Sequence, residues 1–297
     1  MTFSKKLLSF GFLITKIFGR LIDTVICIIR VMIESRINKF PLTRGGGMAY
    51  VLGTGPSLNS DLGHLLSHLS GAEIFCVNDF YKSNYFNILK PKYYVIADQD
   101  YWGESRFKEI ISPLIDAIVQ ANWEISLYLP VTARNSILDR EARVMDLKVY
   151  FYNKTPLAGS AKVSSLLFKR RMAMPRPQNV LVAAIALAMW SGCKQINILG
   201  ADHDWHNEIQ VSNQNILKTK VRHSYDEQEV FRPFFKPRTG SVDQVPVTFT
   251  VAEIFLAWSM IHRSYELLNV LAIKEGVEIY NCGSSSFIDA FNRKNFF

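Results

Sequence analysis

Residues 48–58 read MAYVLGTGPSL, an apolar segment of strand length that runs directly into a glycine loop. Helical patterns cover residues 178–191, which open after two prolines and end before a glycine, and residues 252–275. Apolar strands that alternate with helices are typical of a parallel sheet covered on both faces, so the chain is predicted to be an α/β protein with a mostly parallel sheet. Six more apolar segments have strand length: residues 72–78 (AEIFCVN), 93–98 (YYVIAD), 124–130 (EISLYLP), 148–153 (KVYFYN), 195–200 (QINILG) and 277–281 (VEIYN).

The composition is that of an ordinary globular protein. The 297 residues are 48% hydrophobic and 20% charged, which excludes disordered, collagen-like and coiled-coil classes. The length suits one large domain or two small ones. The four cysteines lie far apart without a CxxC pair, so neither a zinc site nor a disulfide framework is expected, and a reducing compartment is favoured.

The positive charge is concentrated at the N-terminus. Residues 1–45 hold eight Lys and Arg against two acids, a net charge of +6 out of the +8 of the whole chain. The remaining chain is almost neutral, whereas a nucleic-acid-binding domain needs a basic stripe on its folded surface. We therefore expect no nucleic-acid partner.

Residues 5–35 predict an amphipathic helix. Six charged residues fall within about 80° of one another on a helical projection, and the opposite side is apolar. The charges interrupt the segment too often for a spanning helix, and no small-residue cleavage site follows as in a secretory signal. We expect a helix lying in the plane of a membrane, with a core-packing helix and self-association into a homo-oligomer as open alternatives.

Two further features set the predicted domain organisation. Gly45–Gly47 form a hinge, so residues 1–45 are expected to be an appended membrane-associating helix and residues 46–297 the main domain. Residues 206–248 are polar and weakly patterned, and such a long insertion is predicted to be a lid over a functional site.

Polar clusters follow five of the predicted strands. In an open parallel sheet, ligands bind at the carboxyl ends of the strands, so we expect the functional site there. These clusters are residues 53–57 (GTGPS), 78–79 (ND), 98–100 (DQD), 200–204 (GADHD) and 281–284 (NCGS).

The glycine loop is the first candidate for phosphate binding. Gly53 and Gly55 permit a tight turn, and free N–H groups there can hold a phosphate. The loop is neither a P-loop nor a good dinucleotide fingerprint, because Leu58 stands where the third glycine of that fingerprint belongs. Asn78 ends the second strand and can bind a ribose, base or phosphate, while Asp79 can alternatively hold a ribose hydroxyl.

Metal binding is the weaker interpretation of the acidic clusters. Asp98-Gln99-Asp100 and Asp202-His203-Asp204 are DxD strings, which can bind a divalent cation that neutralises a diphosphate. His203 and His206 lack a third remote zinc ligand. We expect no required cofactor and no metal site, with a divalent cation as the open alternative.

Together these segments resemble a known group of enzymes. VLGTGPSL (51–58), FCVNDFY (75–81), YVIADQDYW (94–102), VAAIALAMWSGCKQINILGAD (182–202) and VEIYNCGSSSFIDAF (277–291) are similar in order and spacing to segments of bacterial CMP-sialic acid-dependent sialyltransferases. The chain also resembles a related family that includes flagellin nonulosonate transferases and archaeal hydroxymethylpterin diphosphokinases. The resemblance spans about residues 48–291 and implies a single Rossmann-like nucleotide-binding domain.

The resemblance implies roles for particular residues. The family's glycine loop and following Asn bind the cytidine monophosphate. The family has Asn at the positions of Thr54 and Asp98, and a tyrosine soon after the GxD strand, where this chain has Asp204 and Trp205. One of Arg170, Arg171 and Arg176 is a candidate to face the carboxylate of the sugar. The predicted nucleotide-binding set is Gly53, Thr54, Gly55, Pro56, Ser57, Asn78, Asp98, Asp202, Asn281 and Ser284.

A lid histidine is the general base in that family, and His223 lies at a matching distance after the GxD strand. The neighbouring cation Arg222 favours a neutral His223, which suits a base near neutral pH. Carboxylates beside His203 and His206 are expected to raise the pKa of both imidazoles. The predicted catalytic residues are therefore His223, with His203 as the alternative, and Asp204.

The expected function is that of a glycosyltransferase. It moves a sialic-acid-like or other 2-keto sugar acid from a CMP donor to a glycolipid or surface-polysaccharide acceptor, as a peripheral protein at the cytoplasmic face of a bacterial inner membrane. A single leaving phosphate can be stabilised by N–H, O–H or Arg groups, so a metal is not obligatory. The alternatives are a magnesium- and ATP-dependent diphosphokinase of the hydroxymethylpterin type and a non-catalytic nucleotide-binding protein.

Overall fold

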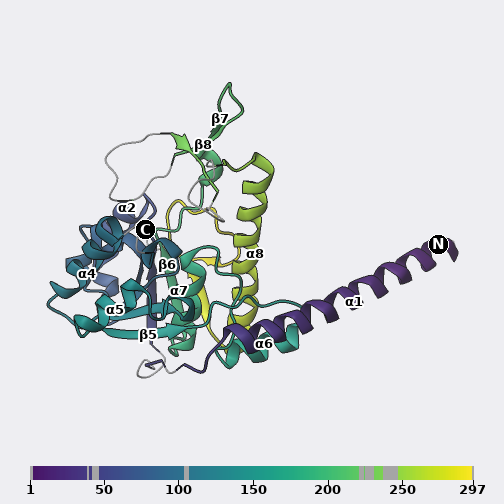
Figure 1. Ribbon diagram of the computed structural model, residues 1–297, viewed down its shortest axis with the longest axis horizontal. Coiled ribbons are helices and arrows are strands. Elements are labelled where there is room, and N and C mark those ends of the chain that lie inside the picture. The colour runs from purple at the N-terminus through teal and green to yellow at the C-terminus, as the bar shows by residue number, and fades with distance from the viewer. Residues whose placement is uncertain are drawn as a thin grey trace.

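A sheet of eight parallel strands forms the centre of the computed structural model, in the order β11-β10-β6-β1-β2-β3-β4-β5 (Figure 1). The structure describes residues 3–38, 40–41, 47–103, 107–220, 224, 231–236 and 247–295, with side chains from residue 15 onward except that of His68. The strands are β1 (Met48–Leu52), β2 (Glu73–Val77), β3 (Tyr93–Val95), β4 (Ser126–Pro130), β5 (Lys148–Tyr152), β6 (Gln195–Leu199), β10 (Glu278–Asn281) and β11 (Asn292–Arg293).

The predicted fold class is confirmed. All seven predicted strands lie in this sheet, and helices surround it to give a Rossmann-like α/β arrangement. Strand β11 was not expected, because two residues carry no periodic signal. The helices are α1 (Phe3–Glu34), α2 (Leu58–Leu65), α3 (Phe86–Leu89), α4 (Ser112–Val119), α5 (Ile137–Val144), α6 (Ala161–Lys169), α7 (Val180–Trp190) and α8 (Val251–Glu275). Shorter helical turns are Leu66–Leu69, Asn78–Lys82, Gln99–Tyr101, Phe107–Ile111, Val131–Ala133 and Trp205–Glu208.

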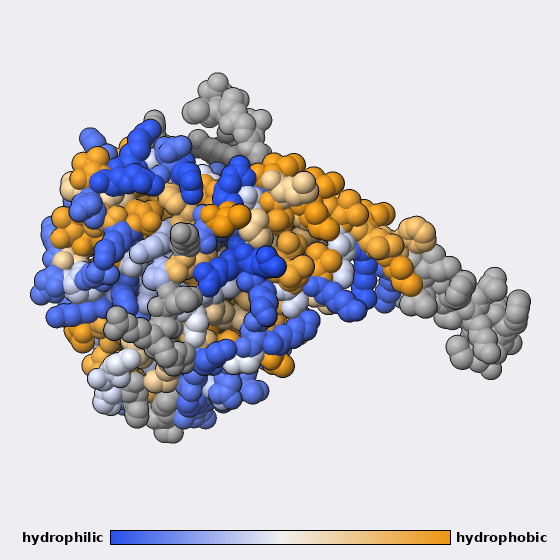
Figure 2. Space-filling model, turned by 90° about the horizontal axis from the view of Figure 1, so that it is seen from below, coloured by the Kyte–Doolittle hydropathy of each residue, from blue (hydrophilic) through white to orange (hydrophobic). Residues whose placement is uncertain are grey.

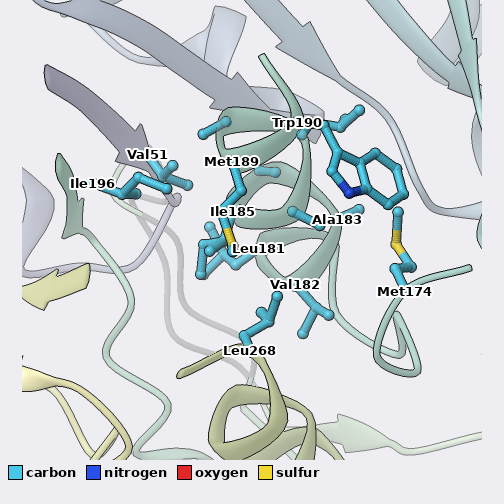
Figure 3. Packing of buried hydrophobic residues seen from close by; sticks show 14 of the residues in the cluster. Val51, Met174, Leu181, Val182, Ala183, Ile185, Met189, Trp190, Ile196 and Leu268 are labelled. Atoms are coloured by element: carbon cyan, nitrogen blue, oxygen red, sulfur yellow. The ribbon is translucent and has the colours of Figure 1, made fainter. Parts of the chain in front are cut away.

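Both faces of the central part of the sheet are buried, which is why β1, β2, β3, β4 and β6 are mostly apolar. One face packs on α7 and α8, and the other packs on α2, α4 and α5. Helix α7 is buried on all sides from Leu181 to Trp190, and its four alanines allow a close approach to the sheet (Figure 3). Leu268 of α8 packs against α7 on the side away from the sheet (Figure 3).

The chain changes direction across the sheet between β1 and β6. Strands β1 to β5 follow one another toward one edge, and β6, β10 and β11 extend toward the other edge. Such a topological switch point leaves a crevice at the carboxyl ends of the two adjoining strands. Here these ends carry Gly53 and Gly200, whose backbones lie against each other. A Cβ atom on Gly53 would lie 2.2 Å from the carbonyl oxygen of Gly200.

The predicted lid contains a small antiparallel sheet of its own. Its strands are β7 (Ile209–Val211), β8 (Leu217–Thr219) and β9 (Arg232–Pro233), which lie beyond the carboxyl end of the main sheet (Figure 1). Ser224 connects this region to the glycine loop, because its N–H donates to the carbonyl oxygen of Thr54 at 2.8 Å. The predicted base His223 lies outside the described residues.

Helix α1 forms as predicted and projects from the main body (Figure 1). The last turns of the helix and the chain that follows it contribute to the core of that body. Val31 of α1 and Phe40 after it are buried, and the Phe40 ring stacks on Tyr128 with centroids 6.1 Å apart. Gly45 and Gly46 of the predicted hinge lie outside the described residues, so a domain boundary at residue 45 stays a prediction. Among the described helices, none combines the length and the apolar character needed to cross a bilayer.

The contact between Gly53 and Gly200 yields a stability test. Gly53→Ala should lower the free energy of unfolding by about 1–3 kcal/mol, because the methyl group must displace backbone atoms. Gly63→Ala in α2 is the matched control, since nothing lies within 4 Å of its added Cβ and alanine favours a helix. Urea denaturation of both variants measures the difference, and equal stabilities would contradict the role given to Gly53.

Candidate functional site

A cavity of about 340 Å³ lies at the switch point. Strand ends, the first turn of α7, the lid and α8 all contribute to its wall, so it brings together residues more than 200 positions apart in the sequence. Its lining residues are Gly53, Thr54, Gly55, Pro56, Val77, Asn78, Gln178, Asn179, Val180, Leu181, Gly200, Asp202, His203, Asp204, Trp205, Glu208, Thr219, Lys220, Phe234, Trp258 and Ile261. We call it the switch-point cavity.

A second cavity of about 340 Å³ adjoins it on the β3 side. It shares Asn78 and the residues 178–180 with the switch-point cavity. Ala97, Asp98, Gln99 and Pro177 complete its lining. The two cavities therefore form one crevice over the ends of β6, β1, β2 and β3, divided by Asn78 and the start of α7.

The glycine loop is fastened to β6 by its own amides. The N–H groups of Gly53 and Gly55 donate to the carbonyl oxygens of Leu199 and Gly200, at 2.8 and 2.9 Å. The N–H of Ser57 donates to Asp202 Oδ2 at 2.9 Å. This corrects the expectation that the loop offers these N–H groups to a phosphate. A backbone this close to its neighbour explains the glycines without a ligand.

Asp202 completes this attachment. Its second carboxylate oxygen accepts a hydrogen bond from the Ser57 hydroxyl, so one side chain holds both donors of Ser57. Burial raises the pKa of Asp202, an effect that the hydrogen bonds from Ser57 oppose. A Cβ on Gly55 would lie 2.8 Å from Asp202 Oδ2, so Gly55 is needed for the same contact. Asp202 borders the cavity, but its carboxylate is used mainly to hold the glycine loop through Ser57.

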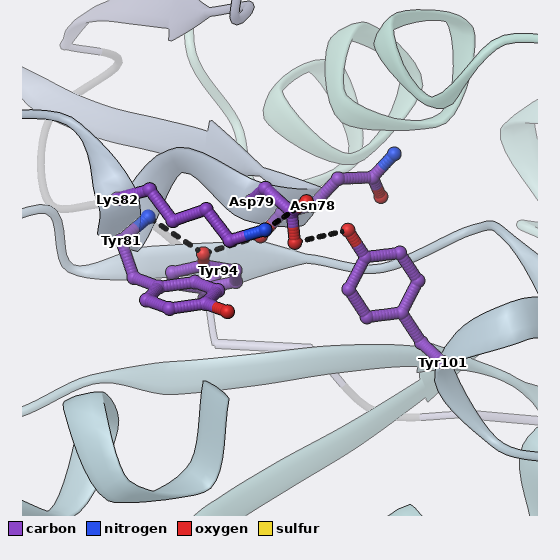
Figure 4. A network of polar contacts seen from close by, with 6 residues as sticks. All are labelled: Asn78, Asp79, Tyr81, Lys82, Tyr94 and Tyr101. Atoms are coloured by element: carbon purple, nitrogen blue, oxygen red, sulfur yellow. Dashed lines mark hydrogen bonds and ion pairs between the residues drawn. The ribbon is translucent and has the colours of Figure 1, made fainter. Parts of the chain in front are cut away.

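Asn78 is held in an uncommon conformation with its side chain at both cavities. Its φ angle is +44°, in the left-handed region, and the buried Tyr94 hydroxyl donates to its carbonyl oxygen. Tyr94 in turn accepts from the N–H of Tyr81 at 3.1 Å. The Asn78 amide points away from this network (Figure 4), and its Oδ1 is buried without a hydrogen-bond partner. A buried acceptor without a partner is costly, so a ligand N–H or O–H is expected to complete it.

Asp79 is engaged elsewhere. Its carboxylate accepts from the hydroxyl of Tyr101 at 2.6 Å and from the ammonium of Lys82 at 2.8 Å (Figure 4). Asp79 lines neither cavity. Its contacts fix the turn that carries Asn78, so the interpretation of Asp79 as a ribose ligand receives no support from its position.

The first turn of α7 supplies the positive end of a helix dipole to both cavities. Asn179 caps the helix, since its Oδ1 accepts from the N–H of Leu181 at 2.8 Å. The N–H of Val182 donates to the Asn179 carbonyl oxygen at 3.2 Å, so attraction of an anion to this turn rests mainly on the helix dipole. Pro175 and Pro177 end the preceding segment, and they are the sequence signal that could have placed this turn in the site.

The surroundings of His203 favour its neutral form, contrary to expectation. It is buried, and its Nε2 lies 2.8 Å from the hydroxyl of Tyr265 on α8. Burial, followed by repulsion from His262, lowers the pKa of His203 to about 3. The expected rise from neighbouring carboxylates is therefore wrong for His203, because burial and the repulsion from His262 are what act on its pKa. An imidazole with this pKa is a weak base and serves better as a hydrogen-bonding wall.

An aromatic wall closes the switch-point cavity on the side of the lid and α8. The Trp205 ring lies 4.2 Å from that of His203 and 5.9 Å from that of Trp258, measured between centroids. Phe234 of the lid and Ile261 of α8 extend this apolar surface. Sequence reasoning missed Trp258, Phe234 and Ile261, because nothing in a long amphipathic helix or a polar insertion marks one residue as facing a ligand.

Charged side chains complete the cavity. Asp204 and Glu208 come from the turn after β6, and Lys220 follows β8. The lysine can neutralise the charge of a phosphate, and the two carboxylates can accept hydrogen bonds from hydroxyl groups. Within the described part of the chain, no group of three or more His, Cys, Asp or Glu side chains could hold a metal ion.

Two predicted ligands lie beside the crevice and make other contacts. Asn281 Nδ2 donates to Ser286 Oγ at 3.0 Å and to the carbonyl oxygen of Ile288 at 2.8 Å. The N–H of Ser284 donates to Asp61 Oδ2 at 3.1 Å. Neither residue lines the two cavities, and neither do Ser57, Arg170, Arg171 and Arg176. Of the predicted set, Gly53, Thr54, Gly55, Pro56, Asn78, Asp202, His203 and Asp204 line the switch-point cavity, and Asp98 lines its neighbour.

Comparisons with known proteins leave the family open. No protein-family model matches the chain, and no curated protein does. Among solved structures, the MAf glycosyltransferase from Magnetospirillum magneticum AMB-1 is 13% identical with a TM-score of 0.47, over 88% of this chain and 35% of that one. The terminal R domain from the myxalamid PKS-NRPS biosynthetic pathway is 11% identical with a TM-score of 0.19, over 87% of this chain and 55% of that one. This chain thus spans about a third and about half of the two lengths, and such distant likenesses establish no activity.

The buried neutral His203 predicts a pH dependence of stability. Its folded pKa of about 3 lies below the ordinary 6.5, so its contribution is complete above pH 6.5 and is lost as the pH falls toward 3. Between about pH 7 and pH 5 the stability difference between wild type and His203→Gln should shrink by about 2 kcal/mol. The exposed His64→Gln is the matched control in denaturant titrations. A difference for His203→Gln that does not change with pH would contradict the buried neutral state.

Proposed function

We propose that this chain is a glycosyltransferase that moves a sialic-acid-like or other 2-keto sugar acid from a CMP donor to a glycolipid or surface-polysaccharide precursor. The observation that carries the proposal is the unpartnered Asn78 Oδ1 beside the first turn of α7 at the switch point. It supports a ligand with both hydrogen-bond donors and an anionic group. A nucleoside monophosphate linked to a sugar has both.

The parts of the crevice suggest how such a donor binds. The first turn of α7 and Lys220 suit the phosphate, and Asn78 Oδ1 suits a ribose hydroxyl or the cytosine amino group. The aromatic wall of Trp205 and Trp258 offers faces on which a base or sugar ring can stack. Asp98 in the adjoining cavity suits sugar hydroxyls. The remaining predicted ligands, Asn281 and Ser284 among them, stay predictions.

The proposed transfer needs one base. The acceptor hydroxyl oxygen attacks the anomeric carbon, the bond from that carbon to the phosphate oxygen breaks, and CMP leaves with the electron pair. A base takes the acceptor proton. His223 is our candidate, since its neighbour Ser224 contacts the glycine loop at Thr54. Asp204 at the cavity is a second candidate, and His203 is a weaker one because of its lowered pKa.

The acceptor class we propose places the reaction at the cytoplasmic face of a bacterial inner membrane. Glycolipids and lipid-linked polysaccharide precursors present their sugars at that surface. No step of this scheme requires a metal, because N–H groups, the helix dipole and Lys220 can stabilise the leaving phosphate.

Donor binding tests the site. Asn78→Gly removes the amide while keeping a residue that tolerates its left-handed backbone, and it should weaken CMP binding by about tenfold. Asn135→Gly is the matched control, because Asn135 is an exposed asparagine with a φ of +62°. Calorimetric titration measures both. Equal affinities for the two variants would move the nucleotide elsewhere, and magnesium-dependent binding of ATP in place of CMP would favour a diphosphokinase.

Turnover tests the base. His223→Ala should lower turnover by about 10²–10⁴-fold at saturating donor and acceptor, with donor affinity nearly unchanged. His203→Gln should retain more activity, since its imidazole is a weak base. Turnover of His223→Ala close to that of the wild type would exclude His223 and direct attention to Asp204→Asn.

A further inference from the structure

Helix α1 is mounted on the main body by one narrow edge. Gly159 packs against Thr24 so closely that a Cβ there would lie 2.3 Å from Thr24 Oγ1. The same hydroxyl accepts from the N–H of Ser160 at 2.8 Å, and Cys27 Sγ donates to the carbonyl oxygen of Pro156 at 3.6 Å. The residues of this edge are small or polar. Among the bulky apolar side chains that the structure describes in α1, Val31 alone is buried against the body, and the others are left exposed.

Those apolar residues face away from the body. Ten large hydrophobic side chains between Ile17 and Ile33 are exposed, from 39% for Ile28 to 76% for Met32. On a helical projection they span about 180° and begin where the mounting edge ends. Figure 2 shows the resulting orange side of α1, with hydrophilic residues along its other side. We call this surface the α1 arc.

The width of the arc favours a lipid surface over a second copy of the chain. A two-helix seam buries a narrow stripe at a and d positions, whereas an arc of about half the helix circumference exceeds that stripe. A helix lying at the boundary between headgroups and acyl chains buries a face of this width.

The charge around the arc fits an anionic surface. Lys16, Arg20 and Arg30 are exposed on the hydrophilic side of the described helix, against the exposed acids Asp23 and Glu34. Glu34 lies 3.8 Å from Arg30, so Lys16 and Arg20 supply most of the positive charge of this side. Residues 1–45 carry eight Lys and Arg against two acids. Clustered cations beside an apolar helix face are attracted to anionic headgroups.

We propose that the α1 arc lies in the plane of an anionic lipid bilayer and holds the protein on it. This inference does not depend on the reaction at the switch-point cavity. In this arrangement the apolar face contacts the lipid, and the mounting edge fixes the orientation of the body above the bilayer.

Vesicle flotation of the full chain tests the proposal. Wild type should float with vesicles that contain phosphatidylglycerol and should bind less to pure phosphatidylcholine or at high salt. Ile22→Glu and Ile29→Glu both lie on the arc. Each should lower the partition coefficient between vesicle and water at least about tenfold. Ile273→Glu on α8 is the matched control, because it places the same charge at an exposed isoleucine of a different helix.

Folding and association are measured on the same samples. The arc residues are exposed, so the circular dichroism and the melting temperature of the arc variants should equal those of the wild type. A loss of vesicle binding then does not result from unfolding. Light scattering reports oligomeric state. Wild type that ignores anionic vesicles, or arc variants that float like Ile273→Glu, would overturn the proposal. A wild-type dimer that does not bind vesicles and that Ile29→Glu dissociates would assign the arc to a second copy.

Discussion

The rest of the site depends on the contact between the chain after β1 and the chain after β6. Gly53 and Gly200 touch through their backbones, and the N–H of Gly55 donates to the Gly200 carbonyl at 2.9 Å. Asp202 then holds Ser57 at the start of α2. Since the loops close on each other, the crevice opens toward α7, the lid and α8. A looser contact between these two loops would open the base of the cavity.

The sheet could be predicted from sequence because its signal is local. Each central strand is an apolar run of about five residues, and such an uninterrupted run predicts burial on both faces of the sheet. The end of each strand is marked by the first glycine, asparagine or aspartate after it. The ligand edge could therefore be predicted, and Asn78, Asp98 and Asp204 do lie there.

What these residues do at that edge could not be predicted, because it depends on remote partners. Sequence neighbours of His203 are acids, but its pKa is set by burial and by His262, which comes from α8. Likewise, the amides of the glycine loop look free until β6 is placed beside them. Trp258 enters the site only through the position of α8.

The attachment of α1 to the body likewise could not be predicted from the sequence, and it connects the helix to the crevice. The sequence predicts an amphipathic helix, but its contact with Gly159 lies far along the chain. Beyond that contact, Ser35 Oγ donates to the carbonyl oxygen of Met172 at 2.6 Å, in the segment that leads into the cap of α7. The N–H of Arg36 donates to Asn153 Oδ1 at 2.8 Å just after β5. Because the end of α1 is hydrogen-bonded to the segment that precedes the crevice wall, any surface that holds α1 also sets the direction in which the crevice faces. Orientation of the site then follows from the fold itself.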